Sequence, residues 1–351
     1  MSFFRSITGD IPSEQMGITY SHEHIVIEES FPTLGNPDFL LNDVEKISAE
    51  LSGLKALGCS TMVDTMPANA GRNVLKSVEI SERTGINIII PTGVHLEIYY
   101  PASHWRYYYT ENQLTLLFVQ DIVTGIDKYD YNGPITQPTP YKAGLIKLAT
   151  GDGPFTKHQE KIFHAVVNAH LDTGAPILTH TNNGNHALAQ AELFEKLGAN
   201  LSHIVLSHVD RNKDIGYHNA LMQTGVSVEY DSAFRWKTVD ENWTYTLLEK
   251  LLPLYPNQIT AGMDAARNTY WRAYGGKPGL DYLLTTFKDE LNRRSLGAYF
   301  DNIFVENPKR IFGFEGGVKG GWFVMAKMPG PFELGIFVWL VFFATSAQLS
   351  A

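Results

Sequence analysis

Short apolar runs that end in polar residues recur along the chain and predict β-strands. They cover residues 18–27, 60–65, 87–93, 143–150, 176–181, 203–209, 226–232 and 259–264. Segments with apolar residues at helical spacing lie between them, for example residues 43–58, 158–174 and 186–199. Strands that alternate with helices predict parallel pairing through crossover connections. Eight such units in about 300 residues favour an α/β fold of the closed (β/α)8 TIM barrel type.

An open, doubly wound sheet is the alternative α/β arrangement. Such a sheet usually has a glycine-rich, phosphate-binding turn directly after its first strand. No turn of that kind follows residues 18–27. The closed barrel is therefore the preferred prediction.

An insertion of roughly residues 95–141 separates the third and fourth units. It is rich in Tyr, Trp and Pro and includes the run HLEIYYPASHWRYYY. Long loops at the carboxyl ends of barrel strands usually carry specificity. We therefore expect this insertion to border a substrate site.

The C-terminal end differs in composition from the rest of the chain. A glycine-rich stretch, residues 316–321, leads into an apolar run at residues 334–344 that is too short to span a bilayer comfortably. It is either a tail that docks on a membrane surface or a partner, or an appended extension that the barrel does not need, and the second interpretation is preferred. We expect a single domain at residues 1–314, a tail of unknown role at 315–351, and no membrane span.

The composition is that of an ordinary globular protein, with 351 residues, 44% of them hydrophobic and 19% charged. A formal net charge of −9 argues against a general nucleic-acid binder, because phosphate-backbone binding normally needs a basic surface. The single cysteine, Cys59, cannot form an internal disulfide, and the N-terminus lacks the pattern of a signal peptide. We therefore predict a cytoplasmic protein.

Two histidines in the first predicted strand are the first candidates for chemistry. His22 and His24 are separated by one residue, so both side chains point to the same face of the strand, which is the barrel interior. A lone buried histidine is more often a satisfied core residue than a ligand. Two imidazoles on one face provide half of a metal site.

Lys147 lies in the middle of the fourth predicted strand, in GLIKLAT, and alternation directs it into the barrel. An unpaired buried ammonium is very costly. One interpretation pairs this lysine with an acid inside the barrel, such as Asp264. The other is that the neutral amine has reacted with CO₂, so that the two oxygens of the carbamylated lysine each hold one of two adjacent cations.

Three more candidate ligands stand at strand ends, where barrel enzymes place their catalytic groups. His180 and His208 end the fifth and sixth predicted strands, and Asp264 ends the eighth. Nitrogen and oxygen ligands without thiolate suit zinc, manganese, cobalt or iron. Together with the residues above, they predict two divalent metal ions, with zinc as the first choice. Asp210, two residues past His208, is a candidate to orient a ligand.

This order of motifs resembles the phosphotriesterase-like branch of the amidohydrolase superfamily. The resemblance runs over roughly residues 8–314, including the opening SHEHI and the closing NPKRIF. It implies that His22, His24 and Asp264 bind one metal ion and that His180 and His208 bind the other. Lys147, as a carbamate, would bridge the two ions.

The resemblance also implies a mechanism for such a centre. A hydroxide between the metals would be the nucleophile, and Asp264 would take its proton and deliver it to the leaving group. The histidine that relays this proton in the phosphotriesterases has no match in VEYDSAFRWK. That departure counts against paraoxon-type hydrolysis as the native activity.

Candidate substrate-binding residues follow the seventh and eighth strands. They are Lys237 in SAFRWK, and Arg267 and Tyr270 in DAARNTYW. If a helix begins after Asp264, the spacing puts Arg267 and Tyr270 on one side of it. Two cations and a phenol suit a phosphate group, although scattered charges on a solvated loop would look the same. With GGKPGLDYLL, these motifs resemble the phosphorylated sugar-lactone hydrolases of the same family.

We therefore predict a binuclear-metal hydrolase that opens a lactone of a phosphorylated sugar acid, a small-molecule substrate. A carboxylesterase or phosphotriesterase of broad specificity is the alternative within the enzymes. A non-catalytic, metal-binding barrel module is the alternative of another class. The family resemblance also suggests a homodimer.

Overall fold

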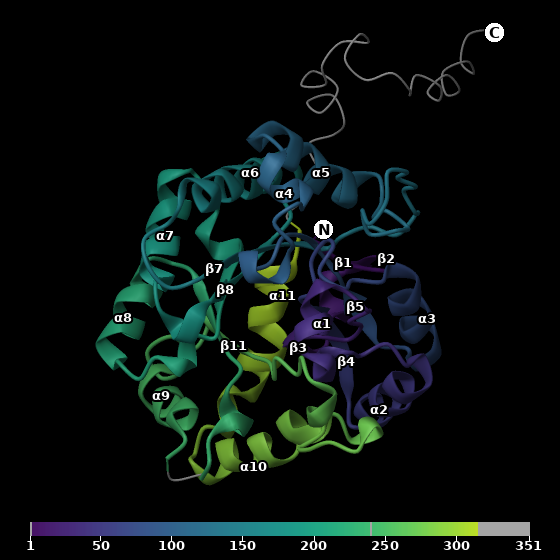
Figure 1. Ribbon diagram of the computed structural model, residues 1–351. Coiled ribbons are helices and arrows are strands. Elements are labelled where there is room, and N and C mark those ends of the chain that lie inside the picture. The colour runs from purple at the N-terminus through teal and green to yellow at the C-terminus, as the bar shows by residue number, and fades with distance from the viewer. Residues whose placement is uncertain (1, 239–240, 315–351) are drawn as a thin grey trace, which may run out of the picture. The chain divides into compact units, whose positions relative to one another are not determined.

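The computed structural model describes residues 2–238 and 241–314, and these residues form a parallel β-barrel surrounded by helices (Figure 1). The predicted tail, residues 315–351, lies outside the described residues. Within the described part of the chain, no helix has both the length and the apolar character needed to cross a membrane.

The barrel strands, β3 to β11 below, occur where the apolar runs predicted them. They are β1 Phe3–Ser6, β2 Gly9–Pro12, β3 Ile18–Glu23, β4 Cys59–Asp64, β5 Asn87–Ile89, β6 Pro91–Gly93, β7 Leu145–Thr150, β8 Ile177–Thr181, β9 Ile204–Ser207, β10 Ser227–Tyr230 and β11 Ile259–Ala261. Strands β3, β4 and β5 pair in that order, and strands β6 to β11 form a second parallel run. Because β5 and β6 are two halves of one strand, interrupted at Ile90, the described residues contain the eight predicted barrel strands.

The barrel closes between its last strand and its first. The backbone N–H of Asp264, just after β11, donates to the carbonyl oxygen of His22 in β3 at 3.0 Å. Strand β10 pairs in parallel with β11 on its other side, through residues Val228 to Tyr230 and Ile259 to Ala261. The (β/α)8 TIM barrel predicted from the sequence is confirmed.

Helices follow the strands, and most of them cover the outside of the barrel, whereas α11 lies at the centre of the ring in this view (Figure 1). They are α1 Phe31–Gly35, α2 Val44–Ala56, α3 Val74–Thr84, α4 Trp105–Tyr108, α5 Glu111–Val123, α6 Lys157–Thr173, α7 Ala187–Lys196, α8 Ile215–Gln223, α9 Trp243–Leu251, α10 Thr286–Arg293 and α11 Asn307–Phe312. In helix α6, capping residues determine where the helix begins and where it ends. Thr156 and Gln159 form a capping box at its start, and Gly174 ends it in the left-handed conformation.

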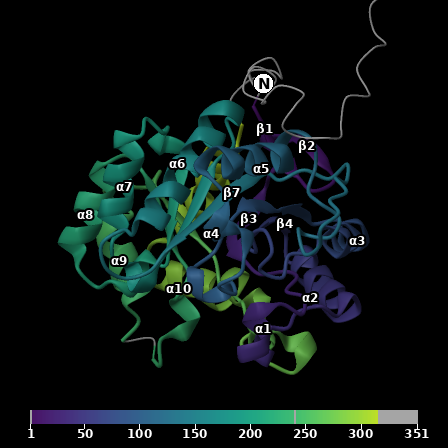
Figure 2. The same ribbon diagram turned by 45° about the horizontal axis from the view of Figure 1, so that its top comes forward.

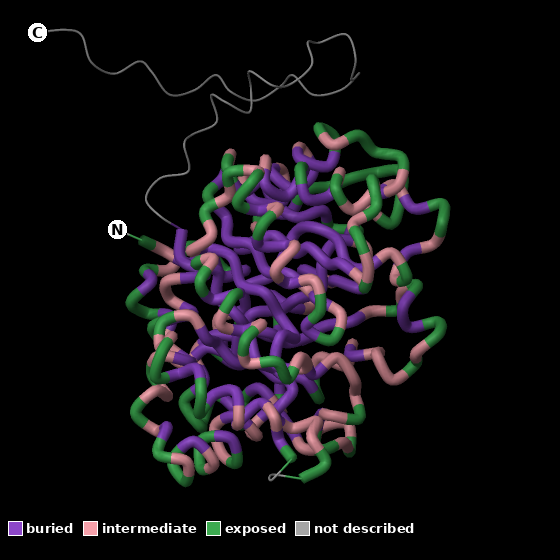
Figure 3. The backbone as a smooth tube through the Cα atoms, turned by 90° about the vertical axis from the view of Figure 1, so that its left-hand side faces the viewer, coloured by how far each residue is buried: buried purple, intermediate pink, exposed green. Residues whose placement is uncertain are grey.

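An apolar cluster fills the barrel interior below the predicted site. It joins residues of five strands to the N-terminal segment and to α11, and its members are Phe4, Met16, Val63, Ile89, Leu145, Leu178, Val205, Ile311 and Phe312. Figure 3 shows the buried backbone concentrated at the centre of the molecule. Lys147 lies two residues beyond Leu145 on the same face of β7, directly after this cluster along the strand.

The sequence patterns did not predict the N-terminal hairpin of β1 and β2. Its strands pair antiparallel, and it lies beside β5 and α5 (Figure 2). The Ile7 N–H donates to the Ile88 carbonyl at 2.7 Å, and Arg5 Nη1 donates to the Ile122 carbonyl at 2.7 Å. Strands of four residues are too short for periodicity to reveal them.

A buried arginine anchors the loop that follows α5. Arg72 Nε donates to Asp130 Oδ1 at 2.8 Å, and its Nη1 donates to Asp121 Oδ2 at 3.0 Å. The Asp127 carboxylate accepts from the backbone N–H groups of Tyr129 and Tyr131. These buried ion pairs and turn contacts fix the insertion at roughly residues 95–141 to the barrel.

Gly93, at the end of β6, should be intolerant of a side chain. A Cβ there would lie 2.0 Å from the Lys147 carbonyl oxygen, and the residue has a φ of +95°. We expect Gly93→Ala to lower the free energy of unfolding by more than about 2 kcal/mol, because strain and a backbone clash add. Gly174→Ala is the matched control, since its φ is +72° but nothing lies within 4 Å of an added Cβ.

The control should cost only about 1 kcal/mol, the penalty of the left-handed conformation. Denaturant unfolding of both variants measures the difference. Equal losses would mean that the contact between Gly93 and β7 contributes nothing beyond backbone strain.

Candidate metal centre and active site

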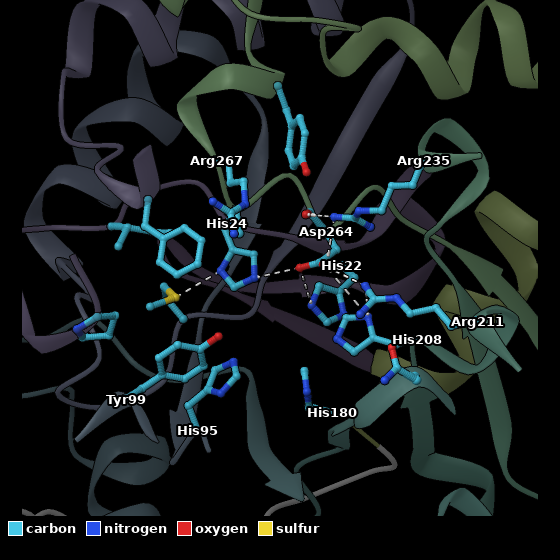
Figure 4. A pocket seen from close by; sticks show the side chains of 17 residues that line it. His22, His24, His95, Tyr99, His180, His208, Arg211, Arg235, Asp264 and Arg267 are labelled. Atoms are coloured by element: carbon cyan, nitrogen blue, oxygen red, sulfur yellow. Dashed lines mark hydrogen bonds and ion pairs between the residues drawn. The ribbon is translucent and has the colours of Figure 1, made fainter. Parts of the chain in front are cut away.

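The six predicted ligands converge at the carboxyl end of the barrel. A cavity of about 450 Å³ opens there, and five of the six line it: His22, His24, His180, His208 and Asp264. Figure 4 shows these side chains around the cavity, with His22 and His24 coming from the end of β3 and the other three from the ends of β8, β9 and β11. Lys147 does not line the cavity, and it is completely buried in β7.

One group of possible metal ligands joins the first and last strands. His24 Nε2 lies 3.1 Å from Asp264 Oδ1, and His22 Nε2 lies 3.7 Å from the same oxygen. One ligand atom from each of these three residues lies within 4.8 Å of the others. Two ring nitrogens and a carboxylate at this spacing fit a divalent cation.

The other predicted histidines complete a cluster of imidazoles. The His208 ring centroid lies 4.8 Å from that of His22 and 4.5 Å from that of His180. His208 Nδ1 lies 2.6 Å from Asp231 Oδ2, and His180 Nε2 lies 3.2 Å from Asn182 Oδ1. Asp210 instead accepts hydrogen bonds from Ser232 and Thr244, so the carboxylate that contacts His208 is that of Asp231.

Burial keeps these imidazoles neutral. It lowers the pKa of His22 and of His208 well below the ordinary value, with the charge of Lys147 adding to the effect on His22 and that of Arg211 adding to the effect on His208. Burial also lowers the pKa of His180 to about 4, and the charge of Lys147 contributes. A neutral ring has one nitrogen with a free lone pair, which is the form that binds metals.

The amine of Lys147 is an unsatisfied polar group next to these histidines. Its Nζ is buried and has no hydrogen-bond partner among the described residues. Burial lowers the pKa of its amine to about 8, although the nearby carboxylates of Glu229, Asp264 and Asp231 raise it in part. An orphaned amine between histidines and carboxylates fits a metal-bridging carbamate, and it also fits a cation balanced at longer range by acids.

Two arginines hold Asp264 as an anion. Arg211 Nη2 donates to Asp264 Oδ2 at 2.9 Å, and Arg235 Nη2 donates to the same oxygen at 3.1 Å. Burial alone would raise the pKa of Asp264, but its other contacts, led by the charge of Arg235, outweigh burial and hold this pKa well below the ordinary value. Asp264 also has a φ of +49°, an uncommon conformation for a residue other than glycine.

The predicted substrate-binding residues are only partly brought together. Arg267 and Tyr270 line the cavity, but Lys237 is exposed and does not. Arg267 forms an ion pair with Asp38 and lies over the Phe39 ring. The helix that was expected directly after Asp264 is a short 3-10 turn at Asn268–Tyr270, with Arg267 just before it.

Sequence reasoning missed five other polar residues that line the cavity: His95, Tyr99, Asn183, Arg211 and Arg235. His95 lies two residues past the predicted third strand, so a search for polar residues near strand ends would also have found it. Its ring centroid lies 5.2 Å from that of His180. No signal distinguished Arg235 from Lys237, two residues further along the same loop.

The sequence pattern of the Phosphotriesterase family matches residues 2–312. The chain belongs to this family. The match covers the barrel strands and each of the six predicted ligands. It supports a divalent metal centre at the cluster of histidines and Asp264.

Several similar proteins align with nearly the whole length of this chain. A phospho-furanose lactonase of Mycoplasmopsis synoviae (strain 53) is 35% identical over 330 residues, which is 89% of this chain and 92% of that protein. The crystal structure of an amidohydrolase from Mycoplasma synoviae has a TM-score of 0.85 and 31% identity, covering 90% of this chain and 93% of that one. A lactonase from Listeria monocytogenes has a TM-score of 0.81 and 32% identity, covering 89% of this chain and 99% of that one.

The buried histidines predict how the metal-free protein responds to acid. His180 has a pKa of about 4 when folded against an ordinary value of 6.5, so the unfolded chain takes up the proton first as the pH falls. The stability that its neutral ring contributes is therefore present above pH 6.5 and is lost between 6.5 and 4. In the presence of chelator, His180→Gln should reduce the slope of unfolding free energy against pH in that window.

The reduction should be at most about 1.4 kcal/mol per pH unit, the value for one proton. Urea unfolding at a series of pH values measures it in both proteins. Parallel slopes would show that His180 does not titrate differently in the folded and unfolded states.

Proposed function

We propose that this protein is a binuclear-metal hydrolase that opens the lactone ring of a phosphorylated sugar acid. The observation that supports it most strongly is the buried Lys147 amine, which has no hydrogen-bond partner among the described residues. Its charge acts on His22, His180 and His208, and the Asp264 carboxylate acts on the amine in turn. The resemblance to a phospho-furanose lactonase supports the choice of substrate.

The proposed ligand set divides between two cations. His22, His24 and Asp264 would hold one, and His180 and His208 the other. When bound, such cations lower the pKa of a water molecule to supply a hydroxide nucleophile, and they polarise the carbonyl oxygen of an ester. We propose zinc, with manganese, cobalt and iron as alternatives, since the donors are nitrogen and oxygen.

Lys147 would bridge the cations as a carbamate. Its neutral amine attacks the carbon of CO₂, a C–N bond forms, and one proton leaves, so that the product has a single negative charge shared by two oxygens. A pKa of about 8 leaves a useful fraction of the amine unprotonated at neutral pH. The new carboxylate also removes a buried positive charge that no described group pairs with directly.

Asp264 would move the proton of the reaction. Arg211 and Arg235 hold its carboxylate as an anion, which makes it a weak base but, once protonated, a strong acid. A proton that it takes up during attack on the carbonyl is therefore readily released to the leaving oxygen. This property favours protonation of an alkoxide, the leaving group in lactone opening.

The cationic wall of the cavity would hold the substrate's phosphate. Arg267 and Tyr270 line this wall, and Arg235 lies over the Tyr270 ring with its guanidinium carbon 5.6 Å from the ring centroid. Arg267 would exchange its ion pair with Asp38 for the phosphate. We retain Lys237 as a predicted contributor, because it lies on the same loop as Arg235, two residues away.

Broad carboxylesterase or phosphotriesterase activity is the alternative, and a non-catalytic, metal-binding module is the alternative of another class. A cationic cavity wall favours an anionic substrate over the neutral triesters of a broad phosphotriesterase. A cytoplasmic location, a homodimer and the absence of nucleic-acid binding remain predictions from the sequence.

Lys147 should be essential for metal binding. We expect about two divalent metals per wild-type chain after supplementation, and a loss of both metal and activity in Lys147→Ala. Elemental analysis measures the stoichiometry, and native mass spectrometry detects the added CO₂. Partial rescue of Lys147→Ala by a short carboxylic acid would support the bridging role, whereas full metal content in the unrescued variant would contradict it.

Arg267 should discriminate in favour of phosphorylated lactones. We expect Arg267→Ala to lower kcat/KM for a phosphorylated sugar lactone roughly thirty- to a hundred-fold more than for the same lactone without phosphate, since a lost charged hydrogen bond costs about 2 to 3 kcal/mol. Lys237→Ala should act in the same direction. Equal losses on both substrates would indicate structural damage, and no preference in the wild type would favour the broad esterase.

A further inference from the structure

A buried glutamate contacts one of the candidate metal ligands from the side away from the cavity. Glu229 lies in β10, and its side chain is fully buried. Its Oε2 is 2.9 Å from His22 Nδ1, and it also accepts a hydrogen bond from Ser207 Oγ at 2.7 Å. Glu229 does not line the cavity, so it is not placed to touch a substrate.

The two ring nitrogens of His22 therefore face different partners. Nδ1 faces Glu229 and Ser207, while Nε2 lies 3.7 Å from Asp264 Oδ1 on the cavity side. A cation beside Asp264 needs the lone pair of Nε2, so the proton of the neutral ring must be on Nδ1. A carboxylate at Nδ1 stabilises that tautomer by accepting its hydrogen.

A glycine at residue 262 leaves room for the Glu229 carboxylate. Gly262 follows β11, and a Cβ there would lie 2.6 Å from Glu229 Oε1 and 2.7 Å from the His22 carbonyl oxygen. The contact between Glu229 and His22 therefore depends on the absence of a side chain at residue 262.

The second carboxylate oxygen argues against a purely structural role. Glu229 Oε1 is buried and has no hydrogen-bond partner among the described residues. A half-satisfied buried carboxylate is costly, and such groups require an explanation other than stability. Asp231 makes a similar contact with His208 Nδ1 at 2.6 Å, although Arg211 Nη2 also lies 3.0 Å from that nitrogen.

We propose that Glu229 is a positioning residue that holds His22 with its proton on Nδ1 and its Nε2 lone pair directed at the cation site. This role rests on the proposed metal centre. Ser207 supports it by donating its hydroxyl hydrogen to the same carboxylate oxygen. The glutamate thereby fixes both the ring orientation and the tautomer before a cation binds.

The test compares Glu229→Leu, which removes the acceptor, with Glu229→Gln, which keeps an oxygen of the same reach. The control is Asp121→Asn, which alters another fully buried carboxylate, one that contacts Arg72 and Thr92 but no candidate ligand. Zinc affinity is measured by competition with a chromophoric chelator. The tautomer is read in metal-free protein from ¹⁵N shifts of labelled histidine, with His22 assigned through His22→Gln.

We expect a Nδ1–H tautomer for His22 in the wild type. Zinc affinity at one site should fall about 10- to 100-fold in Glu229→Leu, less in Glu229→Gln, and not in Asp121→Asn even if that control unfolds more easily. Wild-type zinc uptake with unchanged affinity in Glu229→Leu would overturn the positioning role alone, as would a wild-type Nε2–H tautomer. No zinc uptake by the wild type would instead overturn the proposed centre.

Discussion

The hydrogen bond from the Asp264 amide to the His22 carbonyl oxygen, at 3.0 Å, joins the last barrel strand to the first. Residues more than 200 positions apart become neighbours through this closure, and the candidate cation site of His22, His24 and Asp264 exists only because of it. Glu23 reinforces the same junction, since its carboxylate accepts from the Met263 and Ala265 backbone N–H groups. The junction between the last and first barrel strands therefore forms part of the candidate active site.

Acidic and basic side chains surround this junction between the last and first strands. Buried acids such as Glu229 and Asp231 lie behind the imidazoles, and Arg211 and Arg235 face Asp264 from the cavity side. Arg211 also donates to Asp231 Oδ1 at 3.2 Å, so acidic and basic groups contact each other directly beside the neutral histidines. Such an arrangement stabilises cations among the histidines while it attracts an anionic group to the cavity wall.

The sequence predicted the strands well, because residues inside a barrel must alternate with those outside, and their order followed from simple crossover connections. The six candidate ligands stood out because polar side chains at inward positions are chemically conspicuous. Glu229 was not predicted, because an acid in SVEYD resembles any other polar residue near a strand end. Its contact with His22 becomes visible only in the folded barrel. Arg235 and Lys237 could not be ranked, since loop conformation rather than periodicity decides which one lines the cavity.

The anchoring of the insertion has an evolutionary consequence. Arg72 fastens the loop after α5 from inside the protein through Asp121 and Asp130, while Tyr99, in the same insertion, lines the cavity. Residues at the rim are therefore free to vary without loosening the segment that carries them. Substitutions near Tyr99 and the exposed Ile98 could therefore change substrate preference during evolution without destabilising the barrel or displacing its histidines.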